Sequence, residues 1–264
     1  MSTLILSPRY SEDSRVMRAA AISAGWNVLR LSGWRVPEDD VIDTVAFYGE
    51  PLFVEAVAAQ VGVVLLDAPE DWLPRLPYSV RRREIRVSTL GDARNSADPV
   101  FVKPADGRKG FAGAVYRAGS GLPLPLACPD DTPVLVAEPV RWEVEVRCFV
   151  KDGAVSTMSP YLRHGELARA EDGGWPMTSA ETDAVHACAE KLFAEVPTPP
   201  AVVVDIGLIE GRGWAVVEAN SAYGAGVYGC DPHRVLDVLA RGCVPRTSLS
   251  DNDARWAAPA ADFA

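Results

Sequence analysis

The sequence predicts an α/β and α+β fold, in which a small α/β domain precedes a larger α+β region. Short apolar strands alternate with helix patterns up to the linker at 91–99, which is typical of a parallel sheet flanked by helices. From residue 99 onward this alternation gives way to strands joined by hairpin turns, of which Asp152-Gly153 is the clearest. We therefore expect domains at 1–95 and 96–250, followed by a flexible tail at 251–264.

The N-terminal elements follow from apolar runs and from residues that start or stop helices. Strands are expected at 3–7, 26–31, 45–49 and 61–68. Ser11 and the two acids after it open a helix that is closed at Gly25, and Pro51 fits the first turn of a helix ending near Gln60. A third helix is expected at 78–90. No GxGxxG pattern follows the first strand, so a dinucleotide fingerprint is not indicated.

The second region contains longer strands, one long helix and a short final helix. The expected elements are strands at 99–104, 134–140, 142–150 and 154–163, and helices at 179–195 and 233–241. Asp231-Pro232 caps the final helix. This order predicts a second domain that is built mainly from hairpins.

The composition is that of an ordinary globular protein, with 264 residues, 48% hydrophobic and 23% charged. A formal net charge of −10 argues against non-specific nucleic-acid binding, which requires a basic surface. The sequence contains no apolar run long enough for a membrane span, and its N-terminus lacks the features of a secretory signal. The five cysteines occur singly, which favours reduced thiols in a cytoplasmic protein over a zinc site or a disulfide framework.

A hairpin at 202–220 brings acids together. If Gly211-Arg212 is a two-residue turn, Asp205 lies opposite Glu218, and Asn220 shares the face of Glu218. Cross-strand neighbours lie roughly 5 Å apart, where like charges repel by about 3 to 4 kcal/mol at an effective dielectric near 20. A bound Mg²⁺ would remove this repulsion, whereas the alternative is a solvated sheet face that needs no metal.

A glycine-rich loop follows Lys103, which stands at the end of a strand. The loop carries two cations and three glycines: Gly107, Arg108, Lys109, Gly110 and Gly113. Glycines let backbone N–H groups approach an anion closely, and the cations neutralise it, so the pattern indicates phosphate binding. The alternative is an ordinary basic turn in which Phe111 packs against the core.

The strand at 142–150 places Glu143, Glu145 and Arg147 on one face. Such a face can bind ribose hydroxyls and polyphosphate, or it can be a solvated ion-pair ladder worth under about 1 kcal/mol. Arg163 is a second candidate cation. Pairing around Asp152-Gly153 places Arg163 on the face opposite Arg147, so only a bend in the strand, such as one at Pro160, would bring both to one site.

The order of these motifs resembles that of the ATP-grasp superfamily of ATP-dependent carboxylate ligases, over about residues 75 to 245. Within it, DIG…WAVVEAN together with EVRCFVKDG is similar to a branch of small, divergent members. The resemblance implies two α+β subdomains that grip ATP, preceded by a small Rossmann-like domain.

The resemblance also implies roles for individual residues. Lys103 is similar to the strand lysine that contacts adenine and the α-phosphate, and Glu138 and Val140 match the hinge whose backbone hydrogen-bonds adenine. The mobile loop over the phosphates corresponds to Asp106, Gly107, Arg108, Lys109, Gly110 and Phe111.

Further roles concern ribose, phosphoryl and metal binding. Glu145, or alternatively Glu143, would bind the ribose hydroxyls, and Arg147 with Arg163 would bind the transferring phosphoryl group. Mg²⁺ ions would be held by Asp205, Glu218 and Asn220. An additional upstream cation would be one of Arg82, Arg83 and Arg86, among which the sequence does not choose.

The implied activity is an ATP- and Mg²⁺-dependent carboxylate–amine ligase that forms an amide through an acyl phosphate, on an amino acid or a peptide. The alternatives are a nucleotide-binding module without turnover and a small-molecule kinase. The implied partners are small-molecule or peptide acids and amines, with no nucleic acid and no membrane, and a second copy in a homodimer is a further candidate. Trp175 and Arg169, in the loop at 164–176, are candidate substrate contacts.

Overall fold

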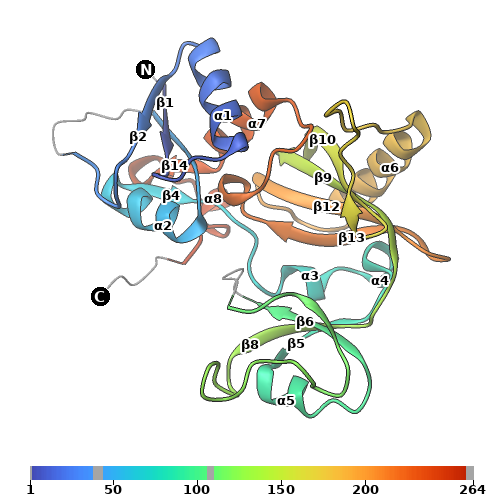
Figure 1. Cartoon of the computed structure of the whole chain (residues 1–264). Coiled ribbons are helices and arrows are strands. Elements are labelled where there is room, and N and C mark those ends of the chain that lie inside the picture. The colour runs from blue at the N-terminus through green and yellow to red at the C-terminus, as the bar shows by residue number, and fades with distance from the viewer. Residues whose placement is uncertain (1, 38–43, 106–109, 260–264) are drawn as a thin grey trace.

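The computed structural model describes residues 2–37, 44–105 and 110–259. A parallel sheet forms the N-terminal unit, as predicted (Figure 1). It consists of β1 (Ser2–Leu6), β2 (Asn27–Arg30) and β3 (Thr44–Tyr48) in the order β2-β1-β3. The helices α1 (Glu12–Ser23) and α2 (Pro51–Gln60) pack against this sheet, and their apolar residues share one core with its strands.

Elements from the C-terminal part of the chain complete this unit. The strand β4 (Val63–Leu65) pairs antiparallel with β14 (Cys243–Pro245), and α7 (Pro232–Arg241) lies beside α1 (Figure 1). The apolar side chains of α7 belong to the core of the parallel sheet. Residues 232–245 therefore pack with the N-terminal unit, although the sequence prediction assigned them to the second domain.

A separate small sheet has the order β5-β8-β6-β7. Its strands are β5 (Ile85–Thr89), β6 (Val100–Pro104), β7 (Ala114–Tyr116) and β8 (Pro133–Ala137), and α5 (Leu90–Arg94) packs on it. The predicted helix at 78–90 is wrong. Its first turn is α4 (Tyr78–Arg81), which ends at Arg82 in a left-handed conformation with φ of 47°, and β5 follows. Because β5 pairs with β8, the predicted boundary at residue 95 lies too late.

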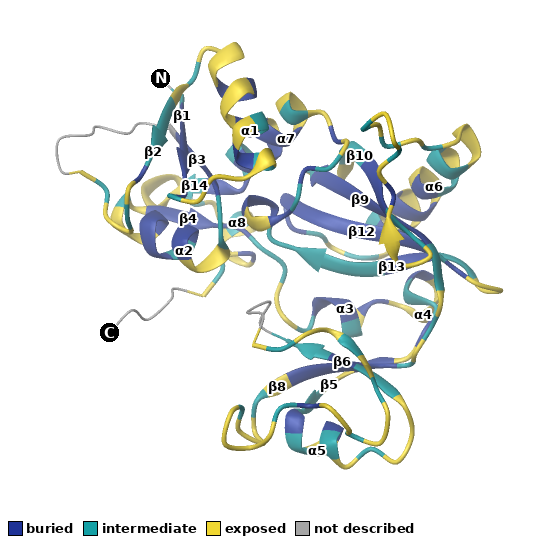
Figure 2. Ribbon diagram, viewed as in Figure 1, coloured by how far each residue is buried: buried dark blue, intermediate teal, exposed yellow. Residues whose placement is uncertain are grey.

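The large sheet has the order β11-β10-β9-β12-β13, and all its neighbours are antiparallel. Its strands are β9 (Trp142–Lys151), β10 (Ala154–Arg163), β11 (Glu166–Leu167), β12 (Ala201–Ile209) and β13 (Gly213–Asn220). The helix α6 (Ser179–Glu195) covers one face, and β9 and β12 at the centre are almost entirely buried (Figure 2). The other face is left for the N-terminal unit and the site described below.

The remaining short elements connect these sheets. They are α3 (Trp72–Arg75), η1 (Ala222–Gly224), η2 (Arg246–Ser248) and α8 (Asp251–Ala254). In Figure 1, α3 and α4 lie between the large sheet and the small sheet. None of the helices in the described ranges is long and apolar enough to cross a membrane.

The predicted flexible tail is wrong for residues 251–259. Trp256 is buried, with 8% of its surface exposed, and packs in the core under the large sheet. The backbone of this segment is also bound, because the Asp67 N–H donates to the Trp256 carbonyl at 2.9 Å and the Ala258 N–H donates to the Leu65 carbonyl at 2.8 Å. One buried indole and these hydrogen bonds fix a segment whose polar, alanine-rich composition suggested disorder.

Candidate functional site

A cavity of about 260 Å³ lies between the small sheet and the large sheet. Apolar side chains form most of its wall, including Leu73, Ile85, Phe101, Leu135, Trp142 and Val217. Four charged side chains also line it: Arg83, Lys103, Glu138 and Glu218. An apolar slot with a few placed polar groups is the usual form of a small-molecule site.

The hairpin of β12 and β13 brings the predicted acids together at the edge of this cavity. Asp205 pairs with Glu218, as the sequence predicted. The side-chain amide of Asn220 donates to both acids, at 3.3 Å to Asp205 Oδ2 and 2.9 Å to Glu218 Oε1. The two carboxylates and the amide thus form one polar group on one face of the sheet.

The predicted pairing of Asp205 with Glu218 is correct, but the turn that was expected to produce it is not. The turn contains three residues between the paired Ile209 and Gly213, where two were expected. A β-bulge at Val217 then adds one residue to β13 and compensates for the longer turn. The predicted opposition of Asp205 and Glu218 is correct because these two departures cancel.

Two cations neutralise the acids. Lys103 Nζ donates to Glu218 Oε2 at 2.6 Å, and Arg147 binds Asp205 through two bonds, Nε to Oδ1 at 3.0 Å and Nη2 to Oδ2 at 2.7 Å. The polar group therefore consists of two ion pairs, Lys103 with Glu218 and Arg147 with Asp205, which the Asn220 amide joins.

Burial and charge act against each other on these groups. Burial by itself would lower the pKa of Arg147, but the neighbouring Asp205 carboxylate outweighs burial and raises it. Burial likewise acts to raise the pKa of Glu218, yet the charge of Lys103 holds it below its usual value. For Asp205, which is fully buried, burial outweighs the attraction of Arg147 and raises the pKa. The charge of Asp205 thus depends on the guanidinium that binds both of its oxygens.

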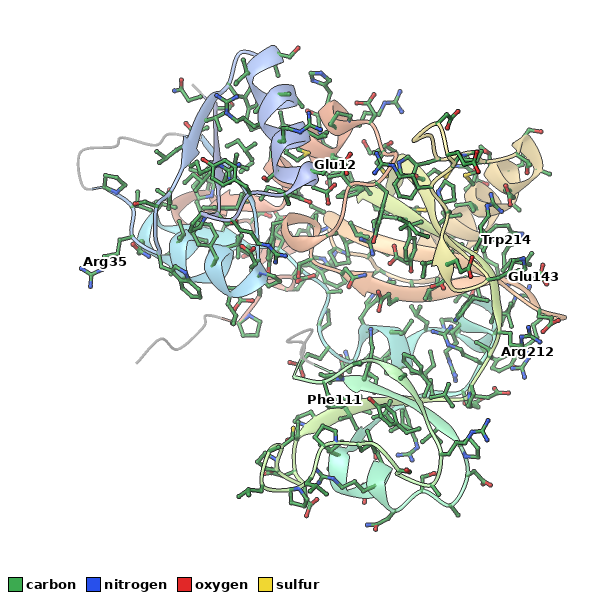
Figure 3. The ribbon with its side chains drawn as sticks, in the orientation of Figure 1. Glu12, Arg35, Phe111, Glu143, Arg212 and Trp214 are labelled. Atoms are coloured by element: carbon green, nitrogen blue, oxygen red, sulfur yellow. The ribbon has the colours of Figure 1, made fainter. Side chains whose placement is uncertain are left out.

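Glu145 lies beside this group on β9. Its side chain is buried and accepts a hydrogen bond from the Tyr161 hydroxyl at 2.9 Å. Burial raises the pKa of Glu145 to about 7, although the bond from Tyr161 acts in the opposite direction. Glu143, the alternative ribose ligand, lies at the outer end of the large sheet (Figure 3). Of the two glutamates, Glu145 is the one close enough to Asp205 and Glu218 for their charges to act on it.

Replacing Glu145 with glutamine is expected to stabilise the protein increasingly as the pH rises. The folded-state pKa of about 7 lies above the usual 4.5, so the folded protein retains a proton that the unfolded chain releases, and wild-type stability falls across this interval. The raised pKa corresponds to at most about 3 kcal/mol above neutral pH. Urea unfolding of both proteins between about pH 5 and pH 8 measures the difference, and a difference independent of pH would contradict the assignment.

Arg163 does not join the group around Arg147. The strand β10 is irregular at Tyr161, but Arg163 still pairs with Val144, whose side chain faces α6. Its guanidinium binds both carboxylate oxygens of Glu181, at 2.6 and 3.0 Å, at the start of that helix. The structure therefore does not bring Arg163 to Arg147, because no bend at Pro160 carries it to the other face.

Among the three upstream arginines, the structure places only Arg83 in the cavity wall. Its side chain is 5% exposed and lies 4.9 Å from the ring of Trp142. Arg82 instead donates to the Arg212 carbonyl at 2.7 Å, and the exposed Arg86 donates to Ser88 Oγ. Sequence reasoning could not choose, because neighbouring positions at a helix end and a strand start point in different directions.

The predicted hinge lies where β8 leads into β9. Glu138 and Val140 both line the cavity. The Glu138 carboxylate binds Arg212 Nη2 at 2.5 Å, and Figure 3 shows Arg212 at the outer end of the β12–β13 hairpin. The hinge and the hairpin turn are thus linked by an ion pair.

The predicted phosphate loop is only partly described. Asp106, Gly107, Arg108 and Lys109 lie outside the described residues. Gly110 is exposed, and Phe111 packs against the core of the small sheet with its ring 6.4 Å from that of Tyr116. Phe111 therefore matches the core-packing alternative.

An aromatic cluster covers Arg147 on the side of the N-terminal unit. The rings of Tyr161 and Tyr228 stack at 5.3 Å, and the Arg147 guanidinium lies 4.9 and 5.1 Å from their centres. Trp175 packs edge-on against Tyr228, and Arg169 forms an ion pair with Glu12 of α1. The sequence singled out Trp175 and Arg169 but missed both tyrosines, because isolated tyrosines carry no pattern.

The donor set fits Mg²⁺ that arrives with a phosphate ligand. Within 2–37, 44–105 and 110–259, no three or more His, Cys, Asp or Glu side chains are grouped so as to hold a metal on their own. Asp205 and Glu218 nevertheless supply two carboxylates, and Mg²⁺ usually takes one or two together with waters and substrate phosphates. Lys103 and Arg147 compensate these charges in the structure.

The fold and this site define an ATP-grasp protein. Residues 81–238 match the family described as ATP-grasp domain, R-2-K clade family 2, which covers more than half of the chain. The chain therefore belongs to the ATP-grasp superfamily and, within it, to this family. A comparison with curated proteins gives no significant match.

Solved structures show the same fold. An ATP-grasp RimK domain protein from Sphaerobacter thermophilus is 18% identical, with a TM-score of 0.56 over 95% of this chain and 100% of that one. The D-cycloserine synthetase DcsG is 15% identical, with a TM-score of 0.59 over 91% and 99%. D-alanine–D-alanine ligase from Bacillus anthracis is 12% identical, with a TM-score of 0.54 over 91% and 96%. The predicted superfamily and fold are confirmed.

Proposed function

We propose that this chain is an ATP- and Mg²⁺-dependent carboxylate–amine ligase, which forms an amide through an acyl phosphate on an amino acid or a peptide. One observation carries the proposal: an unbroken series of contacts runs from Lys103 through Glu218, Asn220 and Asp205 to Arg147 at the wall of an apolar cavity. Membership of the ATP-grasp superfamily supports it.

Bound ATP with Mg²⁺ would supply the phosphoryl group that activates the substrate carboxylate. Lys103 would bind phosphate, and the hinge at Glu138 and Val140 would hold the base against the apolar wall. Glu145 would accept the ribose hydroxyls. The metal would be held by Asp205, Glu218 and Asn220.

Arg147 would stabilise the negative charge that spreads during phosphoryl transfer. A guanidinium has five N–H donors, of which Asp205 accepts two and the Gly226 carbonyl one at 3.4 Å, so the side chain can bind an anion without leaving Asp205. Burial strengthens such an interaction because water screens it less.

The acceptor side of the site supports an amino-acid or peptide substrate. Among structural relatives, D-alanine–D-alanine ligase is named for joining amino acids, and PsnB has a structure complexed with the precursor peptide PsnA2. In this chain the aromatic cluster around Tyr228 and the Arg169–Glu12 pair lie between the N-terminal unit and Arg147. We place the acid and amine substrates there, and the cytoplasmic location and homodimer remain parts of the proposal.

Replacing Glu218 with glutamine is expected to remove Mg²⁺-dependent turnover of ATP. The change deletes a negative charge that Lys103 and the metal share, and losing it should lower activity by about 100-fold or more, since even outer-shell partners of metal ligands cost 10–100-fold. The measurement is ADP release with a pool of amino acids and peptides. Glu210→Gln, at an exposed acid in the turn of the same hairpin, is the matched control.

The same assay separates the alternatives. ATP binding without ADP release across a broad acceptor pool would indicate the nucleotide-binding module. A stable phosphorylated product, without free phosphate and an amide, would indicate a small-molecule kinase. Wild-type activity in Glu218→Gln would contradict the proposed site itself.

A further inference from the structure

The β-bulge at Val217 decides which way Glu218 points. Val216 is buried in the core beneath the large sheet and pairs with Ile206, whereas Glu218 pairs with Asp205 on the opposite face. In a regular strand, residues two apart share a face. Without the extra residue, either Glu218 would enter the core or Val216 would enter the site.

Arg83 binds this bulge through its carbonyls. Its Nη1 donates to the Val216 carbonyl at 2.7 Å, and its Nη2 donates to the Val217 carbonyl at 2.6 Å. Within the described part of the chain, each hydrogen bond of the Arg83 side chain ends on a backbone carbonyl, the third at Arg81. The guanidinium therefore spans the two peptide groups that leave the regular ladder.

Trp142 holds Arg83 from the other side. The guanidinium carbon lies 4.9 Å from the centre of the Trp142 ring. This ring in turn rests on Gly207 of β12, where a Cβ would lie 2.7 Å from Trp142 Cε3 and 2.9 Å from the Val144 carbonyl. Since only glycine leaves this space, Gly207, Trp142, Arg83 and the bulge form one packed stack beside the cavity.

We propose that Arg83 is a positioning residue that stabilises the bulge at Val217 and thereby keeps Glu218 opposite Asp205. The inference rests on the proposed function, in which these two acids hold the metal. Arg83 also lines the cavity, so the competing role is a cation that simply attracts phosphate. The positioning role requires a planar guanidinium, which can bind two carbonyls at a fixed spacing. The phosphate role requires only a positive charge, which a lysine ammonium also supplies.

Two variants separate the roles. Arg83→Lys keeps the positive charge but loses the planar guanidinium, and Arg83→Met loses both. The matched control is Arg141→Met, because Arg141 is an exposed arginine next to Trp142 that pairs with Glu210. For each protein, calorimetry gives the affinity for a non-hydrolysable ATP analogue in EDTA and with Mn²⁺. Amide hydrogen exchange of the segment at 213–220 is measured without nucleotide or metal.

In the wild type, Mn²⁺ should raise the affinity for the nucleotide. If Arg83 positions the bulge, the factor by which Mn²⁺ raises this affinity is at least about tenfold smaller in both variants, as expected for an outer-shell partner of a metal site. In EDTA, the nucleotide affinity of Arg83→Lys changes little. The backbone amides of β13 exchange faster in both Arg83 variants than in Arg141→Met. Wild-type behaviour of Arg83→Lys in the Mn²⁺ titration would overturn the inference in favour of the phosphate role.

The exchange measurement keeps the two proposals apart. If the wild-type protein binds no nucleotide, the proposed function is contradicted. The role of Arg83 at the bulge is then tested by amide hydrogen exchange alone. Unchanged exchange of β13 in both Arg83 variants would overturn the inference, whatever the nucleotide affinity.

Discussion

Replacing Arg147 with alanine is expected to abolish turnover and to lower the free energy of unfolding by roughly 3–5 kcal/mol. Asp205 is fully buried, and its carboxylate is bound by two N–H groups of Arg147. Without the guanidinium, a buried charge would remain, and among the described residues only the Asn220 amide would donate a hydrogen bond to it. The contacts of Arg147 with the rings of Tyr161 and Tyr228 would be lost as well.

From the sequence alone, the same variant is expected to lose activity with its fold intact, and the burial of the ion pair revises that expectation. Denaturant unfolding measures the stability loss, and ADP release measures turnover. The double variant Arg147→Ala with Asp205→Asn is the informative control, because it removes the stranded charge. It should regain much of the stability and none of the activity. Equal stability of Arg147→Ala and the wild type would show that Asp205 is not held as an ion pair.

Trp256→Ala is expected to destabilise the protein by about 3–5 kcal/mol, the usual cost of truncating a buried large aromatic residue. The indole is 8% exposed and packs in the core that lies under the large sheet. Its backbone carbonyl also accepts the N–H of Asp67, whose carboxylate is hydrogen-bonded to the Ser221 hydroxyl next to Asn220. Truncation after Ser250 should therefore act in the same direction.

Thermal and urea unfolding test this result. Leu126→Ala is the matched control, since Leu126 is fully exposed and such surface changes usually stay within about 0.5 kcal/mol. A Trp256→Ala protein as stable as the control would restore the original expectation of a frayed C-terminal segment.

The sequence predicted the parts of the fold that depend on local pattern. The parallel N-terminal sheet, the long helix α6 and the hairpin of β12 and β13 follow from strand and helix periodicity, capping and turn residues. The order of the motifs also identified the superfamily, which the match over 81–238 confirms. Within the site, Lys103, Arg147 and the acids of the hairpin are brought together as expected.

Two of the predictions failed for different reasons. Pairing around Asp152-Gly153 already placed Arg163 on the face opposite Arg147, and the structure shows it there, bound to Glu181. The role beside Arg147 came from the resemblance and needed a bend in the strand that does not occur. The segment at 78–90 contains good helix formers, and it becomes a strand after Arg82 because β8 offers a partner for β5. In this segment tertiary pairing outweighs the weak local preference.

The sequence by itself determined the chemical groups of this protein and the face on which most of them lie, because side-chain alternation and turn chemistry act between near neighbours. The tertiary structure alone decided the bulge at Val217, the choice of Arg83 among three arginines and the burial of Trp256. Each of these depends on contacts between segments far apart in the chain, such as Arg83 with Val216 and Trp256 with Asp67. Such contacts form only when distant segments of the chain pack together, so the local sequence pattern does not predict them.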